Sequence, residues 1–73
     1  MQTATEPHEV SETRRAYLKA DARYGDASAR HRRMPCALTE QHREAARTRL
    51  RATYADYLDA LATAGLPLPG TTR

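Results

Sequence analysis

Apolar residues recur in residues 39–65 at spacings of three and four, which is the period of one face of an α-helix. The residues on this stripe are Ala46, Leu50, Tyr54, Tyr57, Leu58 and Leu61. Thr39 is a favourable N-cap residue, and Gly65 followed by Pro67 is typical of the end of a helix. The pattern therefore predicts one long amphipathic helix over residues 40–64.

A second and thinner stripe precedes it and predicts a helix over residues 7–24. Its inward positions are Val10, Thr13, Tyr17, Ala20 and Tyr24. Proline is tolerated in the first turn of a helix, so Pro7 is compatible with a start at this point. Gly25 and Asp26 together form a turn signal, which places the end of this helix at Gly25.

The segment between the two stripes, residues 25–38, is predicted to be a connector. Asp26 is a suitable cap for a short helix over residues 27–34. Met34 precedes Pro35, and a residue before proline is disfavoured in helical geometry. We therefore expect a short helical piece followed by a bend. The predicted domain spans residues 7–65, between an N-terminal tail (1–6) and a C-terminal tail (66–73).

Two amphipathic helices joined in this way most simply form an all-α antiparallel hairpin. The expected neighbours across the hairpin are Val10 with Leu61, Tyr17 with Tyr54 and Tyr57, and Tyr24 with Arg47 and Leu50. The same alignment brings Asp21 close to Arg43 and Arg47, and it predicts an ion pair there. Such a pair contributes little free energy if it is exposed to solvent.

The short chain and its few large apolar side chains predict association. A 73-residue domain buries a modest share of its surface and usually needs a staple, a metal or a partner. A homodimer would complete a four-helix bundle, and docking onto a larger protein is the alternative. Tyrosine suits interfaces because its ring packs while its hydroxyl stays hydrated. The predicted interface residues are Tyr17, Tyr24, Leu50, Tyr54, Tyr57, Leu58 and Leu61.

Positive charge is concentrated in the middle of the chain. The net charge is +3, and residues 26–51 carry three acidic residues against seven arginines, a net of +4. Clustered arginines contact phosphates, so a nucleic-acid-binding regulator is the alternative function. Its predicted contacts are Arg30, Arg32, Arg33, Arg43, Arg47 and Arg51. The bias of the whole chain toward alanine and arginine, as in a GC-rich coding sequence, weakens this interpretation.

Few residues offer site chemistry. His31, Cys36 and His42 lie within twelve residues and are suitable metal ligands, but their spacing matches no strong zinc pattern. A cysteine beside a histidine can act as a nucleophile, yet so small a chain offers no evident substrate pocket. We therefore predict a non-enzymatic interaction or accessory protein without a cofactor or metal.

The sequence also bears on location. No apolar run approaches the roughly 18 residues that a membrane span requires, and the N-terminus lacks the pattern of a signal peptide. The single cysteine excludes an intramolecular disulfide and suits a reducing compartment. A cytoplasmic protein without membrane contact is the expectation.

Overall fold

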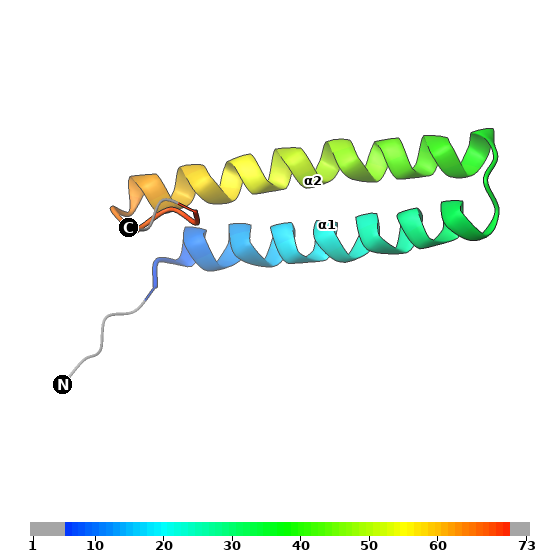
Figure 1. Ribbon diagram of the computed structural model, residues 1–73. Helices are drawn as coiled ribbons and strands as arrows, with labels where there is room; N and C mark the ends of the chain where they lie inside the picture. The colour runs from blue at the N-terminus through cyan, green and yellow to red at the C-terminus, as the bar shows by residue number, and fades with distance from the viewer. Residues whose placement is uncertain (1–5, 71–73) are drawn as a thin grey trace.

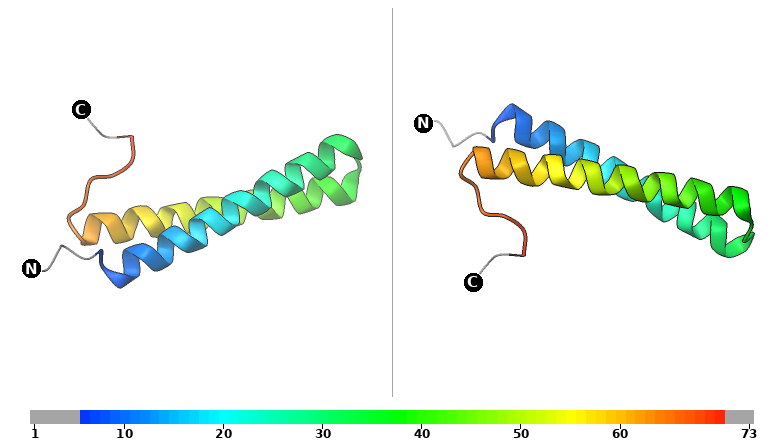
Figure 2. Two further views of the ribbon diagram at one scale, coloured as in Figure 1. Left: turned by 90° about the horizontal axis from the view of Figure 1, so that it is seen from below. Right: turned by 90° about the horizontal axis from the view of Figure 1, so that it is seen from above.

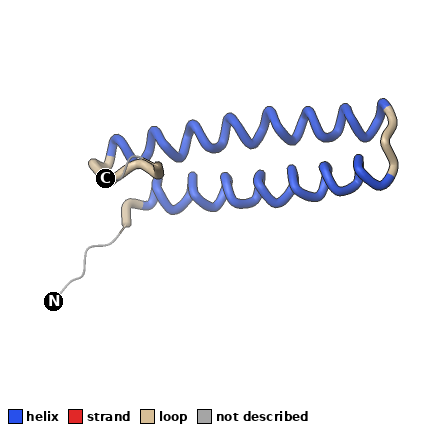
Figure 3. The backbone as a smooth tube through the Cα atoms, viewed as in Figure 1, coloured by secondary structure: helices blue, strands red, loops and turns tan. Residues whose placement is uncertain are grey.

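The computed structural model describes residues 6–70 as two long antiparallel helices (Figure 1). Helix α1 spans His8–Arg33 and helix α2 spans Ala37–Thr63. A short loop joins them at one end, and the start of α1 and the end of α2 lie at the other end (Figure 3). The molecule measures 54 × 25 × 17 Å, and the helices cross at a shallow angle (Figure 2). The predicted all-α helical hairpin is confirmed.

The prediction that the first helix ends at Gly25 is wrong, because α1 continues eight residues further, to Arg33. The separate short helix predicted over residues 27–34 is therefore the last part of α1. Glycine in a helix interior costs roughly 0.5–1 kcal/mol relative to alanine. Ala20 and Ala27 are buried on either side of Gly25, and we attribute the continuation to their packing against α2, which offsets this local cost.

Gly25 predicts a stabilising substitution. A Cβ added at Gly25 meets no heavy atom within 4 Å, so Gly25→Ala should raise the free energy of unfolding by about 0.5–1 kcal/mol. Gly65 is the matched control, since its φ of 75° disfavours any side chain and Gly65→Ala should destabilise. Urea denaturation of both variants measures the two effects. A loss of stability in Gly25→Ala would contradict a continuous α1.

The connector is shorter than predicted, because only residues 34–36 separate the helices. Met34 has φ −142° and ψ 77°, so the helix ends before Pro35 as the sequence indicated. The predicted N-cap, Thr39, is wrong by three residues, because Cys36 caps α2 with an extended backbone. Thr39 is instead the N3 residue, the third residue of α2. The two residues form a capping box, in which the Thr39 hydroxyl accepts from the Cys36 N–H at 3.1 Å.

The end of α2 follows the prediction. The Leu66 N–H donates to the Leu61 carbonyl at 2.9 Å, and the Gly65 N–H donates to the Ala62 carbonyl at 3.1 Å. This pair of hydrogen bonds is a Schellman motif, which requires the positive φ of Gly65. The segment after it was predicted to be a tail, but Leu68 packs back against the core. Of the predicted N-terminal tail, residues 1–5 lie outside the described part of the chain.

The core lies at the end of the hairpin where α1 begins and α2 ends. Val10 is fully buried against Ala60 and Leu61, with Tyr57, Leu58 and Leu68 packed around them. The predicted contact between Val10 and Leu61 is therefore confirmed. Toward the loop the buried positions are small: Ala20, Ala27 and Thr39. The large side chains between these points are only half-buried.

Candidate functional site

Tyr17 of α1 packs against Tyr54 and Tyr57 of α2 in the half of the hairpin that lies away from the loop. We call these three residues the tyrosine cluster. The ring of Tyr17 on α1 lies 4.9 Å from the ring of Tyr54 and 5.8 Å from the ring of Tyr57, measured between centroids. The Tyr17 and Tyr57 rings are nearly parallel, with 10° between their planes. The predicted proximity of Tyr17 to both α2 tyrosines is confirmed, and the stacking adds to the burial of these rings.

Arg14 extends the tyrosine cluster at its edge. Its guanidinium carbon lies 5.7 Å from the centroid of the Tyr57 ring, and its Nε donates to the Tyr57 hydroxyl at 3.4 Å. The same guanidinium forms a bidentate pair with Glu6, with Nη1 at 2.6 Å from Oε1. Hydrogen bonds from Arg14 lower the pKa of the Glu6 carboxyl. Glu6 therefore holds Arg14 over the ring.

The predicted interface residues lie mainly between α1 and α2. Leu61 is buried within a single chain, so it serves the core of the hairpin itself. The other six retain partial exposure; they are Tyr17, Tyr24, Leu50, Tyr54, Tyr57 and Leu58. Tyr24 lies apart from the tyrosine cluster, near Arg43. Leu18, at 55% exposure, is the large apolar side chain that α1 leaves open.

The predicted basic surface divides into two parts. Arg30, Arg32 and Arg33 lie exposed in the last turn of α1, where cations also favour the negative end of the helix dipole. Arg51 is exposed on α2. Arg43 and Arg47 are instead paired on their own helix.

Their partners are carboxylates three residues earlier. Arg43 Nη2 lies 2.7 Å from Glu40, and Arg47 Nη1 lies 3.8 Å from Glu44. The predicted ion pair of Asp21 with either arginine is wrong among the described residues, because both arginines pair within α2 and Asp21 is exposed. Residues three apart lie next to each other on one helix, so each arginine finds its glutamate within α2 and needs no partner from α1.

Thr39 holds the loop end of the hairpin together. Its hydroxyl donates to the Met34 carbonyl at 2.9 Å and accepts from the Cys36 N–H. His31 Nδ1, on α1, lies 2.8 Å from the same oxygen. The other ring nitrogen of His31 lies 3.4 Å from the Glu40 carboxylate. One buried hydroxyl thus connects α1, the loop and α2.

Two of the three weak metal candidates meet at this hydroxyl, and the third does not. His31 and Cys36 both contact Thr39, whereas His42 is exposed. The Thr39 backbone N–H and hydroxyl lower the pKa of the exposed Cys36 thiol. Within residues 6–70 no three histidine, cysteine or acidic side chains are grouped to hold a metal ion. The contacts around Cys36 are those of a helix cap.

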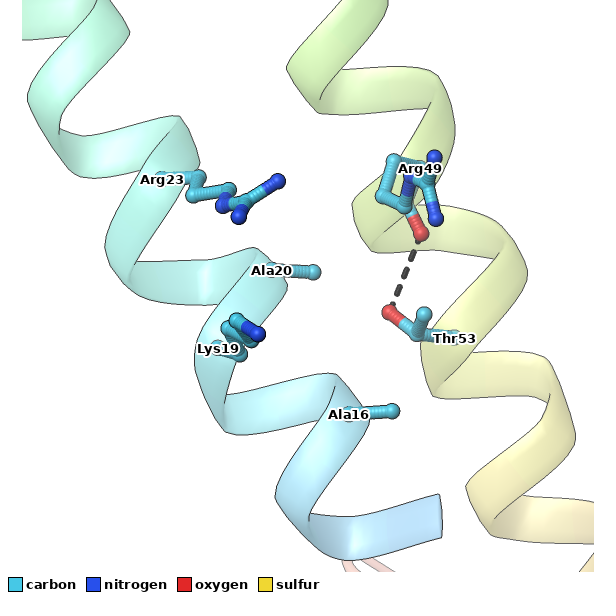
Figure 4. A pocket seen from close by; sticks show the side chains of 6 residues that line it. All are labelled: Ala16, Lys19, Ala20, Arg23, Arg49 and Thr53. Carbon is cyan, nitrogen blue, oxygen red and sulfur yellow. Dashed lines mark hydrogen bonds between the residues drawn. The ribbon is translucent and has the colours of Figure 1, made fainter.

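A charged groove runs along one side of the hairpin, and sequence reasoning missed it. It is lined by Ala16, Lys19, Ala20 and Arg23 of α1 and by Arg49 and Thr53 of α2. Figure 4 shows Arg23 reaching from α1 toward α2, with Ala16 and Ala20 forming the floor. The Thr53 hydroxyl donates to the Arg49 carbonyl at 3.0 Å, so it is satisfied within α2. Three cations thus surround a floor of small side chains.

The size of the charged groove favours protein contact over a small ligand. It encloses about 140 Å³, whereas small-molecule sites usually measure about 300–1,000 Å³. Alanine floors allow another helix to approach closely. In the sequence, the charged groove corresponds only to regularly spaced alanines and charges on the outer helix faces. This pattern is also that of an ordinary solvated surface, so it does not indicate a groove.

Comparisons with known proteins leave the function to be argued from this geometry. Neither α1 nor α2 contains a stretch that is apolar and long enough to cross a lipid bilayer. Searches against protein-family models, curated proteins and solved structures find no match for the chain.

Proposed function

We propose that this chain is a non-enzymatic interaction protein that works as a helical hairpin and completes its core by self-association. The observation that carries the proposal is the composition of the buried set. Among residues 6–70 it comprises Val10, Ala20, Ala27, Thr39, Ala60 and Leu61. Four of these six side chains are alanine or threonine, so Val10 and Leu61 are the only larger aliphatic side chains among the buried residues described in this 54 Å hairpin.

Partial burial of the larger side chains supports the same conclusion. Leu50, Tyr54 and Leu58 lie on α2 with part of their surface open to solvent. Burying an exposed leucine completely contributes about 1.5–3 kcal/mol, and a second hairpin that covers the open part of these half-buried side chains would add a share of that free energy. Two antiparallel hairpins form a four-helix bundle, the simplest arrangement that closes such a core.

Docking onto a larger protein would cover the same surfaces, and it is the alternative to self-association. A homodimer is the form proposed here, because it needs only the chain itself. The small volume of the charged groove suits side chains of a partner helix, which supports an accessory or regulatory role. A cytoplasmic location remains part of the proposal.

Nucleic-acid binding receives less support from the geometry. Arg30, Arg32 and Arg33 stay exposed at the loop end, as that function requires. Arg43 and Arg47 are partly neutralised by glutamates on their own helix. The continuous basic surface predicted from the sequence is thereby interrupted.

Sedimentation equilibrium at low micromolar concentration tests the proposed function. We expect a mass of twice the 8.2 kDa of one chain. Far-UV circular dichroism on the same sample checks that the chain is helical. A helical monomer at this concentration would refute self-association.

A further inference from the structure

The three cations of the charged groove come together from two helices. Lys19 and Arg23 lie about one turn apart on α1, and Arg49 belongs to α2. The antiparallel alignment that places Tyr17 beside Tyr54 puts Arg49 at the level of residue 22, next to Arg23. Figure 4 shows Arg23 reaching across the charged groove toward α2. The three cations therefore border one small concave site.

None of these cations has an anionic partner within residues 6–70. The ion pairs there involve other cations, such as Arg43, which follows its glutamate by three residues. The residues three and four positions away from Lys19 and Arg49 are neutral or basic. Arg23 precedes Asp26 by three residues but forms no ion pair with it. The charged groove thus holds positive charge that an anion would neutralise.

The volume of the charged groove suits a compact anion. It encloses about 140 Å³, several times the roughly 30 Å³ that one water molecule occupies in the liquid. A tetrahedral oxyanion such as phosphate is comparable in size to a few water molecules. Drug-sized molecules need about 300–1,000 Å³, so the volume selects a small charged group.

The lining of the charged groove supplies the donors that a phosphoryl group needs. A guanidinium can donate two parallel hydrogen bonds to phosphate oxygens, and the Lys19 ammonium adds a third positive charge. The Thr53 hydroxyl donates to carbonyls of its own helix, so it is not a donor for the anion. Ala16 and Ala20 keep the floor low, which allows a partner to approach closely.

We propose that the charged groove binds a phosphoryl group carried by a phosphorylated side chain of a partner protein. A phosphoserine carries nearly two negative charges and three acceptor oxygens, and clustered cations are the usual way to recognise it. A carboxylate has a single charge and two oxygens, which leaves part of the cluster unsatisfied. This site goes beyond the proposed self-association and does not depend on it.

The surroundings of the charged groove favour a single phosphoryl group over a nucleic-acid backbone. The adjoining hollow on α1 contains Glu12 as well as Arg15, and the hollow on α2 contains Asp56 beside Arg49. Positive charge is therefore not continuous toward the end where α1 begins. A nucleic-acid backbone requires basic contacts to several successive phosphates. One phosphorylated side chain ends within the charged groove and does not meet these carboxylates.

Two-dimensional ¹H–¹⁵N NMR of the full chain tests the site. One probe is inorganic phosphate, which replaces chloride at constant ionic strength. The other is an alanine-based peptide with one phosphoserine, compared with the same peptide carrying serine. We expect both phosphates to shift the amide signals of Lys19, Arg23 and Arg49, and the phosphorylated peptide to bind at least about tenfold more tightly than its serine form. Unchanged signals at these residues would overturn the proposal.

Substitutions of single arginines separate a site from general attraction between charges. Arg23→Gln and Arg49→Gln should each raise the Kd for the phosphorylated peptide at least about fivefold. Arg23→Lys keeps the charge without the fork of donors, so its Kd should lie between those of the wild type and Arg23→Gln. Arg33→Gln is the matched control, since Arg33 is exposed outside the charged groove, and it should change the Kd less than about twofold. Equal losses from Arg23→Gln and Arg33→Gln, with helicity retained by circular dichroism, would contradict a defined site.

Three further outcomes assign the source of the anion. A phosphorylated peptide that binds no more tightly than inorganic phosphate would overturn a partner protein as the source. A gel shift with duplex DNA that is lost on raising the salt from 50 to 200 mM and abolished by Arg23→Gln, without binding of the peptide, would assign the charged groove to nucleic acid. A monomer that binds the phosphorylated peptide would support this site while it refutes self-association, so the two proposals fail separately.

Discussion

Replacing Tyr17 with alanine should lower the free energy of unfolding by about 2–3 kcal/mol. Tyr17 is the α1 member of the tyrosine cluster, and its ring contacts Tyr54 and Tyr57 at once. Its removal deletes both ring pairs, which contribute about 0.5–1.5 kcal/mol each beyond burial. It also leaves a space that two half-buried rings cannot close.

Urea denaturation at a fixed protein concentration measures this effect. Leu18→Ala is the matched control, since Leu18 neighbours Tyr17 on α1 but is 55% exposed, and we expect a loss below about 1 kcal/mol. Tyr17→Phe keeps the ring and should retain most of the stability. Equal losses from Tyr17→Ala and Leu18→Ala would show that the tyrosine cluster does not hold the helices together.

Replacing Thr39 with valine should lower the free energy of unfolding by about 2 kcal/mol, although the two side chains have nearly the same shape. The substitution removes the oxygen that accepts from the Cys36 N–H and donates to the Met34 carbonyl. It also removes the partner of His31 Nδ1. Polar groups left unpaired near a buried site cost about 1–3 kcal/mol.

The control for Thr39 is an exposed threonine on the same helix. Thr48→Val should change the free energy of unfolding by less than about 0.5 kcal/mol, because Thr48 is exposed. Thr39→Ser retains the hydroxyl and should recover most of the loss. A neutral Thr39→Val would contradict the role of this hydroxyl in joining α1, the loop and α2.

The sequence predicted the hairpin and its inner seam because both depend on periodic apolar residues. Val10 with Leu61 and Tyr17 with Tyr54 followed from the antiparallel alignment alone. Gly65 was identifiable because a helix end that needs a positive φ favours glycine. These features are local patterns or direct consequences of them.

Features that depend on packing were missed. Gly25 has the local signature of a turn, and only the burial of Ala20 and Ala27 against α2 reveals that the helix continues. Thr39 is a good N-cap in isolation, but α2 begins three residues earlier, after the extended backbone of Cys36. In the usual capping box threonine is the N-cap and glutamate or glutamine is the N3 residue, so the sequence pattern did not indicate threonine at N3.

The charged groove was missed for a different reason. Its alanines and charges resemble a solvated helix face, and they form a groove only where α1 and α2 lie side by side (Figure 4). The pairing of Arg43 with Glu40 was, by contrast, available from their spacing. Recognising that Glu40 pairs with Arg43 would have pointed to Arg23 and Arg49, instead of Arg43, as candidate contact residues.

The concentration dependence of thermal unfolding shows whether folding and self-association of the hairpin are one event. If a second copy completes the core, the midpoint temperature should rise steadily as the chain concentration increases from about 1 to 100 μM. The accompanying sedimentation data should show the dimer at temperatures below the midpoint. A midpoint that stays constant over this range, with a helical monomer present throughout, would contradict the account.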